Sequence, residues 1–232
     1  MNFHILTIFP EILDSYINKG MLRIAQEKKL IKIKTHDIRD WATNPQKNVD
    51  DKPYGGGPGQ VLMVEPIYKA LKQIKKRKCT NAKMQKVVLL SAKGKRWNQQ
   101  MAKKYSKLDE VIFVCPRYEG HDERIKKFVD EEISIGDFVL TGGELGAAVI
   151  IDSVSRLLPG VLGKKESLTE ESHSIPGYLE YPQYTRPETF TYKQQNKKTE
   201  KLENKNLKVP SILLSGHHKN IEEWRDKQSK LK

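Results

Sequence analysis

Short apolar runs alternate with amphipathic stretches along the first two thirds of the chain. Residues 3–9 form a nearly continuous apolar run that stops at Pro10, which is typical of a buried strand. Residues 31–38 begin by alternating isoleucine and lysine, the period of two expected of a strand. Between such runs, apolar residues recur at helical spacing. The pattern predicts strands at 3–9, 31–38, 86–91 and 110–115, and helices at 11–29, 65–76, 95–105 and 143–157.

This alternation of strands and helices, joined by short loops, favours one fold class. Neighbouring parallel strands need long crossover connections, and helices usually supply them. Glycines at 136, 142 and 143 bracket a further short strand before the last of these helices. We therefore expect an α/β domain over residues 1–162, with a mainly parallel sheet covered by helices.

The pattern changes after residue 162. Residues 163–176 are rich in Lys, Glu, Ser and Thr, and predict an interdomain linker. The rest of the chain holds a polar tract at 193–208 and a helical pattern at 219–231. So short a segment favours a small second domain, which we expect to be helical and to span residues 177–232.

Positive charge is concentrated in two parts of the chain. The 232 residues include 42 Lys and Arg against 29 Asp and Glu, a formal net charge of +13. Residues 69–107 hold 14 basic groups and no acidic one, and residues 193–232 hold 11 basic and 5 acidic groups. Such an arrangement predicts a surface that faces the phosphates of a nucleic acid. The alternative is a lysine-rich proteome, in which lysine simply occupies solvated surfaces.

Several classes of protein are excluded by what the sequence lacks. Cys79 and Cys115 form no CxxC pair, so a disulfide-rich scaffold and a thiol zinc cluster are excluded. The six histidines show no metal-binding spacing such as HExxH, and we assign no metal ligand. No apolar run reaches the roughly 20 residues of a membrane span, and no signal peptide is evident. We expect a cytoplasmic protein with no membrane partner.

The densest motif is the glycine-rich segment at residues 50–59. Four glycines and two prolines fall within its last seven residues, which lets the backbone approach another group closely. The spacing fits neither a P-loop nor the GxGxxG of dinucleotide-binding folds. The segment is either a ligand-binding loop or an ordinary glycine-rich turn.

A second candidate, at residues 116–124, combines charged and aromatic side chains directly after a predicted strand. Ligands of open α/β sheets bind at the carboxyl ends of strands, which makes this cluster a candidate site. The alternative is that its charges, Asp122 above all, are surface groups in a turn that begins a helix.

Two further segments could contribute to the same site. Gly142 and Gly143 stand at the predicted start of a helix, where free backbone N–H groups can donate hydrogen bonds to a polar group of a ligand. Arg156 stands at the end of that helix, where a cation also favours the helix dipole. The carboxylates of residues 169–173 lie in the predicted linker, where such groups are usually only solvated.

Ten collinear segments together carry a resemblance to a known family. They are VDDKPYGGGPG (49–59), RYEG (117–120), DER (122–124), SIGDFVL (134–140), GGEL (142–145), IDSVSR (151–156), PGVLG (159–163), YTRPE (184–188), LLSGHH (213–218) and WR (224–225). The chain resembles the bacterial tRNA (guanine-N1)-methyltransferases that act on guanosine 37, beside the anticodon, and that belong to the SPOUT class.

The resemblance implies a deep trefoil knot in the α/β domain, a homodimer, tRNA as partner and S-adenosylmethionine as cofactor. The cofactor is expected to lie against three loops that follow strands. The residues implied to bind it are Leu90, Ser91, Pro116, Tyr118, Glu119, Gly120, Ile135, Gly136, Asp137, Phe138, Val139, Leu140, Gly142 and Gly143.

The resemblance also implies catalytic roles. Glu171 matches the general base that takes the proton from guanine N1, and Arg156 matches the cation that meets charge on guanine O6. Both are expected to contact the substrate together with Gly59. Glu119 is placed near the methionine amino group. A requirement for Mg²⁺ is implied without a dedicated set of ligands. The linker and C-terminal domain of each subunit are expected to complete the site of the other.

Glu171, Pro116 and Ala92 depart from the family pattern, and Ala92 stands where the family has Pro. Glu171 stands where the family has Asp, which keeps the carboxylate and adds one methylene. Pro116 stands where the family has Gly, which removes one backbone N–H. Three hypotheses follow: an active enzyme on guanosine 37, a related methyltransferase with another RNA target, and an RNA-binding protein with weakened catalysis. The presence of Arg156, Glu119 and the glycine loops favours the first.

Overall fold

The chain folds into two compact units in the computed structural model. Its contacts separate Met1–Lys165 from Glu166–Lys232, which we call the N-terminal unit and the C-terminal unit. The boundary falls within the segment predicted as a linker, most of which lies outside the described residues. The structure describes residues 1–76, 84–162, 171–195 and 200–231.

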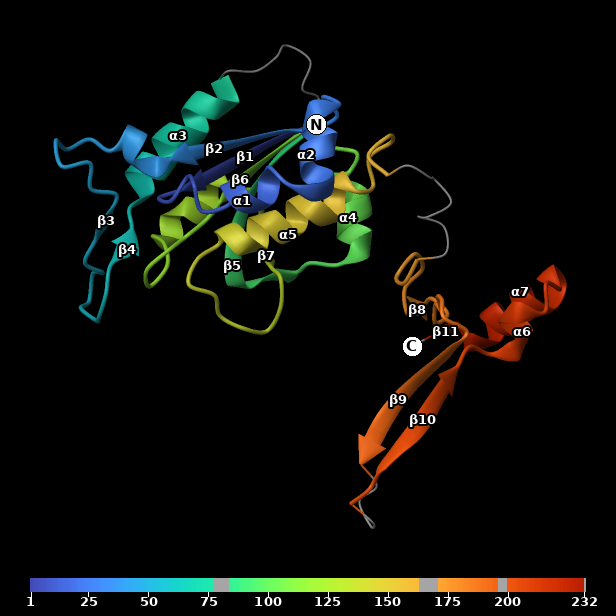
Figure 1. Ribbon diagram of the computed structural model, residues 1–232. Helices are drawn as coiled ribbons and strands as arrows, with labels where there is room; N and C mark the ends of the chain where they lie inside the picture. The colour runs from blue at the N-terminus through green and yellow to red at the C-terminus, as the bar shows by residue number, and fades with distance from the viewer. Residues whose placement is uncertain (77–83, 163–170, 196–199, 232) are drawn as a thin grey trace. The chain divides into compact units, whose positions relative to one another are not determined.

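A five-stranded parallel sheet forms the centre of the N-terminal unit (Figure 1). The strand order is β2-β1-β6-β5-β7, and every neighbouring pair is parallel. The predicted α/β class with a mainly parallel sheet is therefore confirmed. The strands are β1 (Asn2–Thr7), β2 (Lys32–Asp37), β5 (Gln85–Arg96), β6 (Glu110–Val114) and β7 (Glu131–Ser134), and a separate small pair is β3 (Asp50–Asp51) with β4 (Val61–Leu62).

Helices cover both faces of this sheet. Successive side chains of a strand point to opposite faces, so Val111 and Phe113 of β6 join one core cluster while Ile112 and Val114 join the other. The first cluster packs against α1, α2, α4 and α5, and the second against α3 and two 3-10 helices. The helices are α1 (Asp14–Ile17), α2 (Gly20–Glu27), α3 (Val64–Lys76), α4 (Gln99–Tyr105), α5 (Glu144–Ser155), η1 (Ile38–Trp41) and η2 (Glu123–Phe128).

Two predicted helices have different limits in the structure. The helix predicted at 11–29 is two helices, because the chain passes through Gly20 with a φ of +54°, which a helix interior does not accommodate. The helix predicted at 95–105 starts later because β5 continues to Arg96. The side chain of Asn98 then caps α4 by accepting a hydrogen bond from its backbone.

The last strand of the sheet also lies earlier than predicted. β7 ends at Ser134, and the residues bracketed by glycines form a loop. Ile133 of β7 pairs with two residues of β5, Leu90 and Lys95. The β5 residues between them leave the β5–β7 ladder. At Gly94 the two backbones are so close that a Cβ would lie 2.5 Å from the nitrogen of Ile133. This close crossing sets the path of residues 91–93, which leave the sheet at this point.

The C-terminal unit is not purely helical, and that prediction is wrong. The polar tract forms an antiparallel hairpin, because Thr, Phe, Thr and Tyr alternate at strand period over 189–192. The helix predicted at 219–231 ends earlier, at Gln228. No described residue of this unit is buried. Its elements are β8 (Tyr178–Leu179), β9 (Thr189–Gln195), β10 (Leu202–Lys208), α6 (Ser211–Leu214), α7 (His218–Gln228) and β11 (Lys230–Leu231).

Candidate functional site

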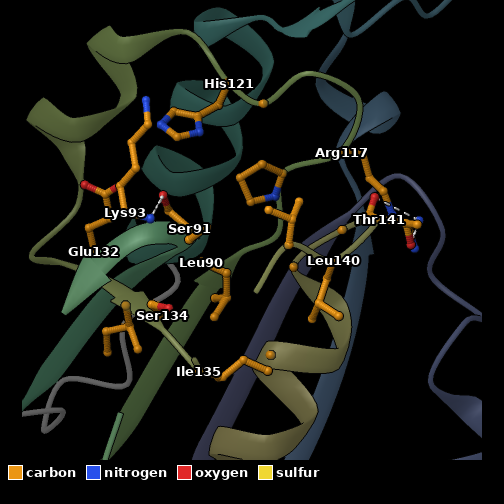
Figure 2. A pocket seen from close by; sticks show the side chains of 18 of the residues that line it. Leu90, Ser91, Lys93, Arg117, His121, Glu132, Ser134, Ile135, Leu140 and Thr141 are labelled. Atoms are coloured by element: carbon orange, nitrogen blue, oxygen red, sulfur yellow. Dashed lines mark hydrogen bonds between the residues drawn. The ribbon is translucent and has the colours of Figure 1, made fainter. Parts of the chain in front are cut away.

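A cavity of about 280 Å³ lies at the carboxyl ends of β5, β6 and β7 (Figure 2). This is the edge at which open parallel sheets bind ligands. Three segments that leave the sheet after these strands surround it, and the first turn of α5 closes it. The lining residues are 90–93, 116–121, 123, 126, 132–136, 138–143 and 146.

Thirteen of the fourteen residues expected to bind the cofactor line this cavity. The exception is Asp137, whose carboxylate pairs with Arg96 and whose side chain is 81% exposed. The structure therefore brings together positions from three distant parts of the sequence. Gly59, which was expected to contact substrate, lies outside the lining but directly behind it.

The glycine-rich loop is joined to the turn after β6 by backbone hydrogen bonds. The nitrogen of Glu119 donates to the carbonyl of Gln60, and the nitrogen of Leu62 donates to the carbonyl of Gly120, both at 3.0 Å. Gly59 has a φ of +79°, and a Cβ there would lie 2.5 Å from Cγ of Glu119. Two motifs that are far apart in sequence thus form one surface, and the close approach requires glycine.

A buried ion pair fixes the start of α5 against the sheet. Glu144 is almost fully buried; its carboxylate accepts a hydrogen bond from the Thr7 hydroxyl at 2.6 Å and lies 3.0 Å from Nε of Arg117. The Arg117 guanidinium also lies 4.9 Å from the centre of the Phe9 ring. A Cβ at Gly142 would lie 2.5 Å from the Glu144 carboxylate, so this position too requires glycine. Losing one partner would leave the other charge buried and unpaired.

Burial shifts the pKa of three groups at or beside the cavity. It lowers the pKa of His121 below the usual 6.5, so the ring is neutral at neutral pH. Burial, followed by the charge of Glu144, raises the pKa of the Cys115 thiol. Burial, followed by the charge of Asp50, raises the pKa of Tyr118. All three groups are therefore uncharged at neutral pH.

The sequence analysis included His121 in the candidate segment 116–124, but it did not single out the cavity residues Lys93, Lys126 and Glu132. Figure 2 shows His121, Lys93 and Glu132 on one side of the cavity, across from Arg117. Nε2 of His121 is buried, and no described residue forms a hydrogen bond with it. The Glu132 carboxylate lies 3.1 Å from the ammonium group of Lys126. Only the position of these residues near strand ends could have indicated them, because isolated charges carry no spacing signal.

The two predicted catalytic residues belong to different units. Arg156 follows the last residue of α5, and its nitrogen donates to the carbonyl of Asp152 at 3.1 Å. Glu171 lies in the C-terminal unit, where its carbonyl accepts a hydrogen bond from the nitrogen of Ser174 at 2.9 Å. Neither residue lines the cavity. The neighbouring Glu170 lies outside the described residues.

The later motifs of the sequence meet within the C-terminal unit. The segment 184–188 and the pair Trp224 and Arg225 line one hollow of about 800 Å³. The guanidinium of Arg225 lies 4.8 Å from the centre of the Tyr181 ring, a cation–π contact. These motifs therefore shape one side of the C-terminal unit.

Two general features bear on metals and membranes. Among the described residues, no three or more His, Cys, Asp or Glu side chains gather closely enough to hold a metal ion. The described part of the chain also has no helix long and apolar enough to span a membrane.

Comparison with known proteins identifies the family of this chain. The profile of the family described as tRNA (Guanine-1)-methyltransferase TrmD matches residues 1–232. The chain is 47% identical over 229 residues to the tRNA (guanine-N(1)-)-methyltransferase of Desulfitobacterium hafniense, covering 99% of this chain and 80% of the relative. It is 47% identical over 231 residues to the protein of that name from Clostridium perfringens, covering 100% of this chain and 89% of the relative. The resemblance seen in the sequence is thus confirmed, and the chain belongs to the tRNA (guanine-1)-methyltransferase family TrmD.

Proposed function

We propose that this chain transfers a methyl group from S-adenosylmethionine to N1 of guanosine 37 in tRNA. The observation that carries the proposal is the cavity at the carboxyl ends of β5, β6 and β7, in a chain that matches the family along its whole length. The residues present fit the cofactor. The buried Nε2 of His121 has no hydrogen-bond partner among the described residues, and the surrounding backbone is rich in glycine. The enzyme acts in the cytoplasm.

The chemistry divides between the cofactor and the chain. When bound, S-adenosylmethionine supplies an electrophilic methyl group on a sulfonium. Guanine N1 carries a proton and becomes a good nucleophile only when that proton is lost. Glu171 takes this proton as general base. Arg156 stabilises the negative charge that develops on O6.

The departures from the family pattern at Glu171 and Pro116 are compatible with activity. Glu171 keeps the carboxylate that a general base needs. Pro116 lacks an N–H, but its carbonyl accepts a hydrogen bond from the nitrogen of Gly143 at 3.0 Å. The proline thus anchors the start of α5 to the turn after β6. The thirteen lining residues named above are proposed to hold the cofactor, with Glu119 near its amino group.

We also propose the trefoil knot that the family implies. The support is the crossing at Gly94, where β5 passes against the backbone of β7 directly after the cavity-lining residues 90–93. Among the described residues, no three or more His, Cys, Asp or Glu side chains are close enough together to hold Mg²⁺. The implied Mg²⁺ requirement stays a prediction.

A homodimer is proposed for a physical reason as well. Leu145 and Val149 lie one turn apart on α5 and are 59% and 47% exposed. The half-exposed ring of Tyr16 in α1 adds to this apolar face. It is held against α5 because its hydroxyl donates a hydrogen bond to the Asp152 carboxylate. An apolar face of this kind typically marks an interaction surface. A second copy is the occupant that would also supply Glu171 to a site containing Arg156 of the first.

The test is a methyl-transfer assay with tRNA transcripts that differ only at position 37. The proposal predicts incorporation of one methyl group, recovered as N1-methylguanosine, in the transcript with guanosine 37 and none with adenosine 37. Equal incorporation in both transcripts would indicate another RNA target. Binding of tRNA with no incorporation would indicate an RNA-binding protein without catalysis.

A further inference from the structure

The hairpin β9–β10 is the most exposed element of the C-terminal unit. Its two strands have seven residues each, and only Tyr192 and Glu203 among them are partly buried. Figure 1 shows the hairpin extending away from α6 and α7 of the same unit. An isolated two-stranded hairpin is only marginally stable in water. A surface that contacts this hairpin would therefore be expected to stabilise it.

One face of the hairpin is aromatic and apolar. Phe190 and Tyr192 project from β9 on the same side, with ring centres 6.1 Å apart and planes inclined by 9°. Across the ladder, Leu207 pairs with Phe190 and Lys205 pairs with Tyr192. Phe190 is 55% exposed and Leu207 is 60% exposed. Two parallel rings beside a lysine form a platform on which a flat aromatic ligand can stack.

The opposite face is polar. The Thr191 hydroxyl donates to the Asn206 side chain at 2.8 Å, and Lys193 and Lys208 lie on the same side of the ladder. Charge is also uneven within the unit. Residues 189–208 hold six lysines and two glutamates, whereas the rest of the unit holds six basic and eight acidic residues. The net positive charge of the C-terminal unit thus comes from residues 189–208.

We infer that the hairpin β9–β10 is an RNA-binding ribbon, in which Phe190 and Tyr192 stack an unpaired base of the tRNA and the lysines contact phosphates. The inference rests on the proposed function for the identity of the RNA. Unpaired bases are recognised by stacking on aromatic side chains presented by a β-surface. Lys205, on the same face as the rings and 3.3 Å from the Glu203 carboxylate, can contact the phosphate beside the stacked base, and Lys193 and Lys208 on the other face add to the attraction of the RNA backbone.

The test compares tRNA binding by the full chain and by F190A/Y192A. Loss of two stacking rings is expected to weaken tRNA affinity by about 10- to 100-fold. KM for tRNA should rise with little change in kcat, and affinity for S-adenosylmethionine should not change. The single variant Y192W, which keeps Phe190, should retain its affinity for tRNA, because the indole ring of tryptophan also stacks on a base. T189A/T191A on the polar face is the matched control and should change affinity much less.

The outcomes separate this inference from the proposed function. If the unaltered chain binds tRNA without methylating it, the proposed function fails and the ribbon is still tested by the variants. If F190A/Y192A binds tRNA as tightly as the unaltered chain, the ribbon is overturned. If F190A/Y192A sediments at a lower mass than the unaltered chain, the hairpin joins two copies of the chain, and the inference is likewise overturned. Circular dichroism of each variant verifies that α6 and α7 stay folded.

Discussion

The two units of this chain differ in how their residues are buried. Every buried residue that the structure describes lies at Val161 or earlier, where two apolar clusters cover both faces of the parallel sheet. In the C-terminal unit none of the described residues is buried, and apolar side chains such as Leu202 and Leu207 are more than half exposed. The N-terminal unit is thus held by its own core. The C-terminal unit depends far more on what it contacts.

This difference matches the division of work that we propose. A cavity that must fit one cofactor benefits from fixed walls, and here the walls are set by close contacts at Gly94, Gly142 and Gly143. A surface that binds RNA needs cations and exposed rings more than a core. Cofactor binding, RNA binding and proton transfer should therefore be separable by substitutions in one unit or the other.

The largest effect is expected for Glu171→Gln. The amide keeps the size of the side chain but cannot take the proton from guanine N1. Turnover should fall by about 10²- to 10⁴-fold. Affinity for S-adenosylmethionine, measured by calorimetry, should stay unchanged because the cavity lies in the N-terminal unit.

Two variants check the assignment of the base. Glu170→Gln is the matched control and should retain most activity. Equal losses in both variants would contradict the choice of Glu171. Glu171→Asp restores the family residue, and its rate should rise if the extra methylene misplaces the carboxylate.

The next largest effect is expected for salt, which should weaken the binding of tRNA but not that of S-adenosylmethionine. Binding of tRNA releases counterions from its phosphates, so affinity should fall by roughly 100-fold between 50 and 200 mM salt if about four phosphates are neutralised. Affinity for S-adenosylmethionine should change little over the same range. Filter binding with labelled tRNA and calorimetry with the cofactor provide the comparison. A flat response of tRNA binding would argue against a phosphate-facing surface.

The rigidity of the N-terminal unit can be tested at its glycines. Gly94→Ala places a Cβ 2.5 Å from the backbone of Ile133, which cannot move aside easily. We expect the free energy of unfolding to fall by about 1–3 kcal/mol in urea titrations. Gly146→Ala is the control, because the nearest atom to its Cβ would be Cδ1 of Leu90 at 3.0 Å, and its next contacts, at 3.6 and 3.7 Å, are ordinary van der Waals contacts with side chains. A gain of about 1 kcal/mol in helix propensity offsets that contact. Equal stability of the two variants would contradict the close crossing.

The smallest effect concerns pH. Burial lowers the pKa of His121 below 6.5 in the folded chain, so on acidification the unfolded chain takes up the proton first. The contribution of His121 to stability is complete above pH 6.5 and is lost as the pH falls through its folded pKa. His121→Gln should therefore reduce the loss of unfolding free energy between pH 7.5 and 5.5. His218→Gln is the exposed control, and an unchanged pH dependence in His121→Gln would refute the role of burial.

The sequence predicted the N-terminal unit better than the C-terminal one for a physical reason. A buried parallel strand such as 110–115 must be apolar throughout, and that signal is visible in a single sequence. The hairpin β9–β10 has no buried face, so Lys193 and Lys205 stand where apolar residues would have marked a strand. The lysine-rich residues 193–208 therefore predicted only a polar tract, although residues 189–192 alternate at strand period and pair within a local hairpin.

For the site too, the sequence pattern predicted the segments better than the contacts between them. Most of the cofactor residues came from motifs, and they do meet at one cavity. His121 lies in the candidate segment 116–124, but the contacts among Thr7, Glu144 and Arg117 were not predicted, because they join residues that only the fold brings together. Asp137 lies in a motif, yet its side chain faces solvent and Arg96. A motif identifies the loop, whereas the fold decides which of its side chains face the cavity.

The division of work between units is tested most directly with a heterodimer. One copy carries Arg156→Ala and the other carries Glu171→Gln, with different affinity tags so that the mixed dimer can be purified. If each site combines Arg156 of one copy with Glu171 of the other, one of the two sites is intact, and methyl transfer to tRNA should recover to about half of the unaltered rate. Both parent homodimers should be nearly inactive. A mixed dimer as inactive as its parents would show that both residues act within one copy, and would contradict the shared site.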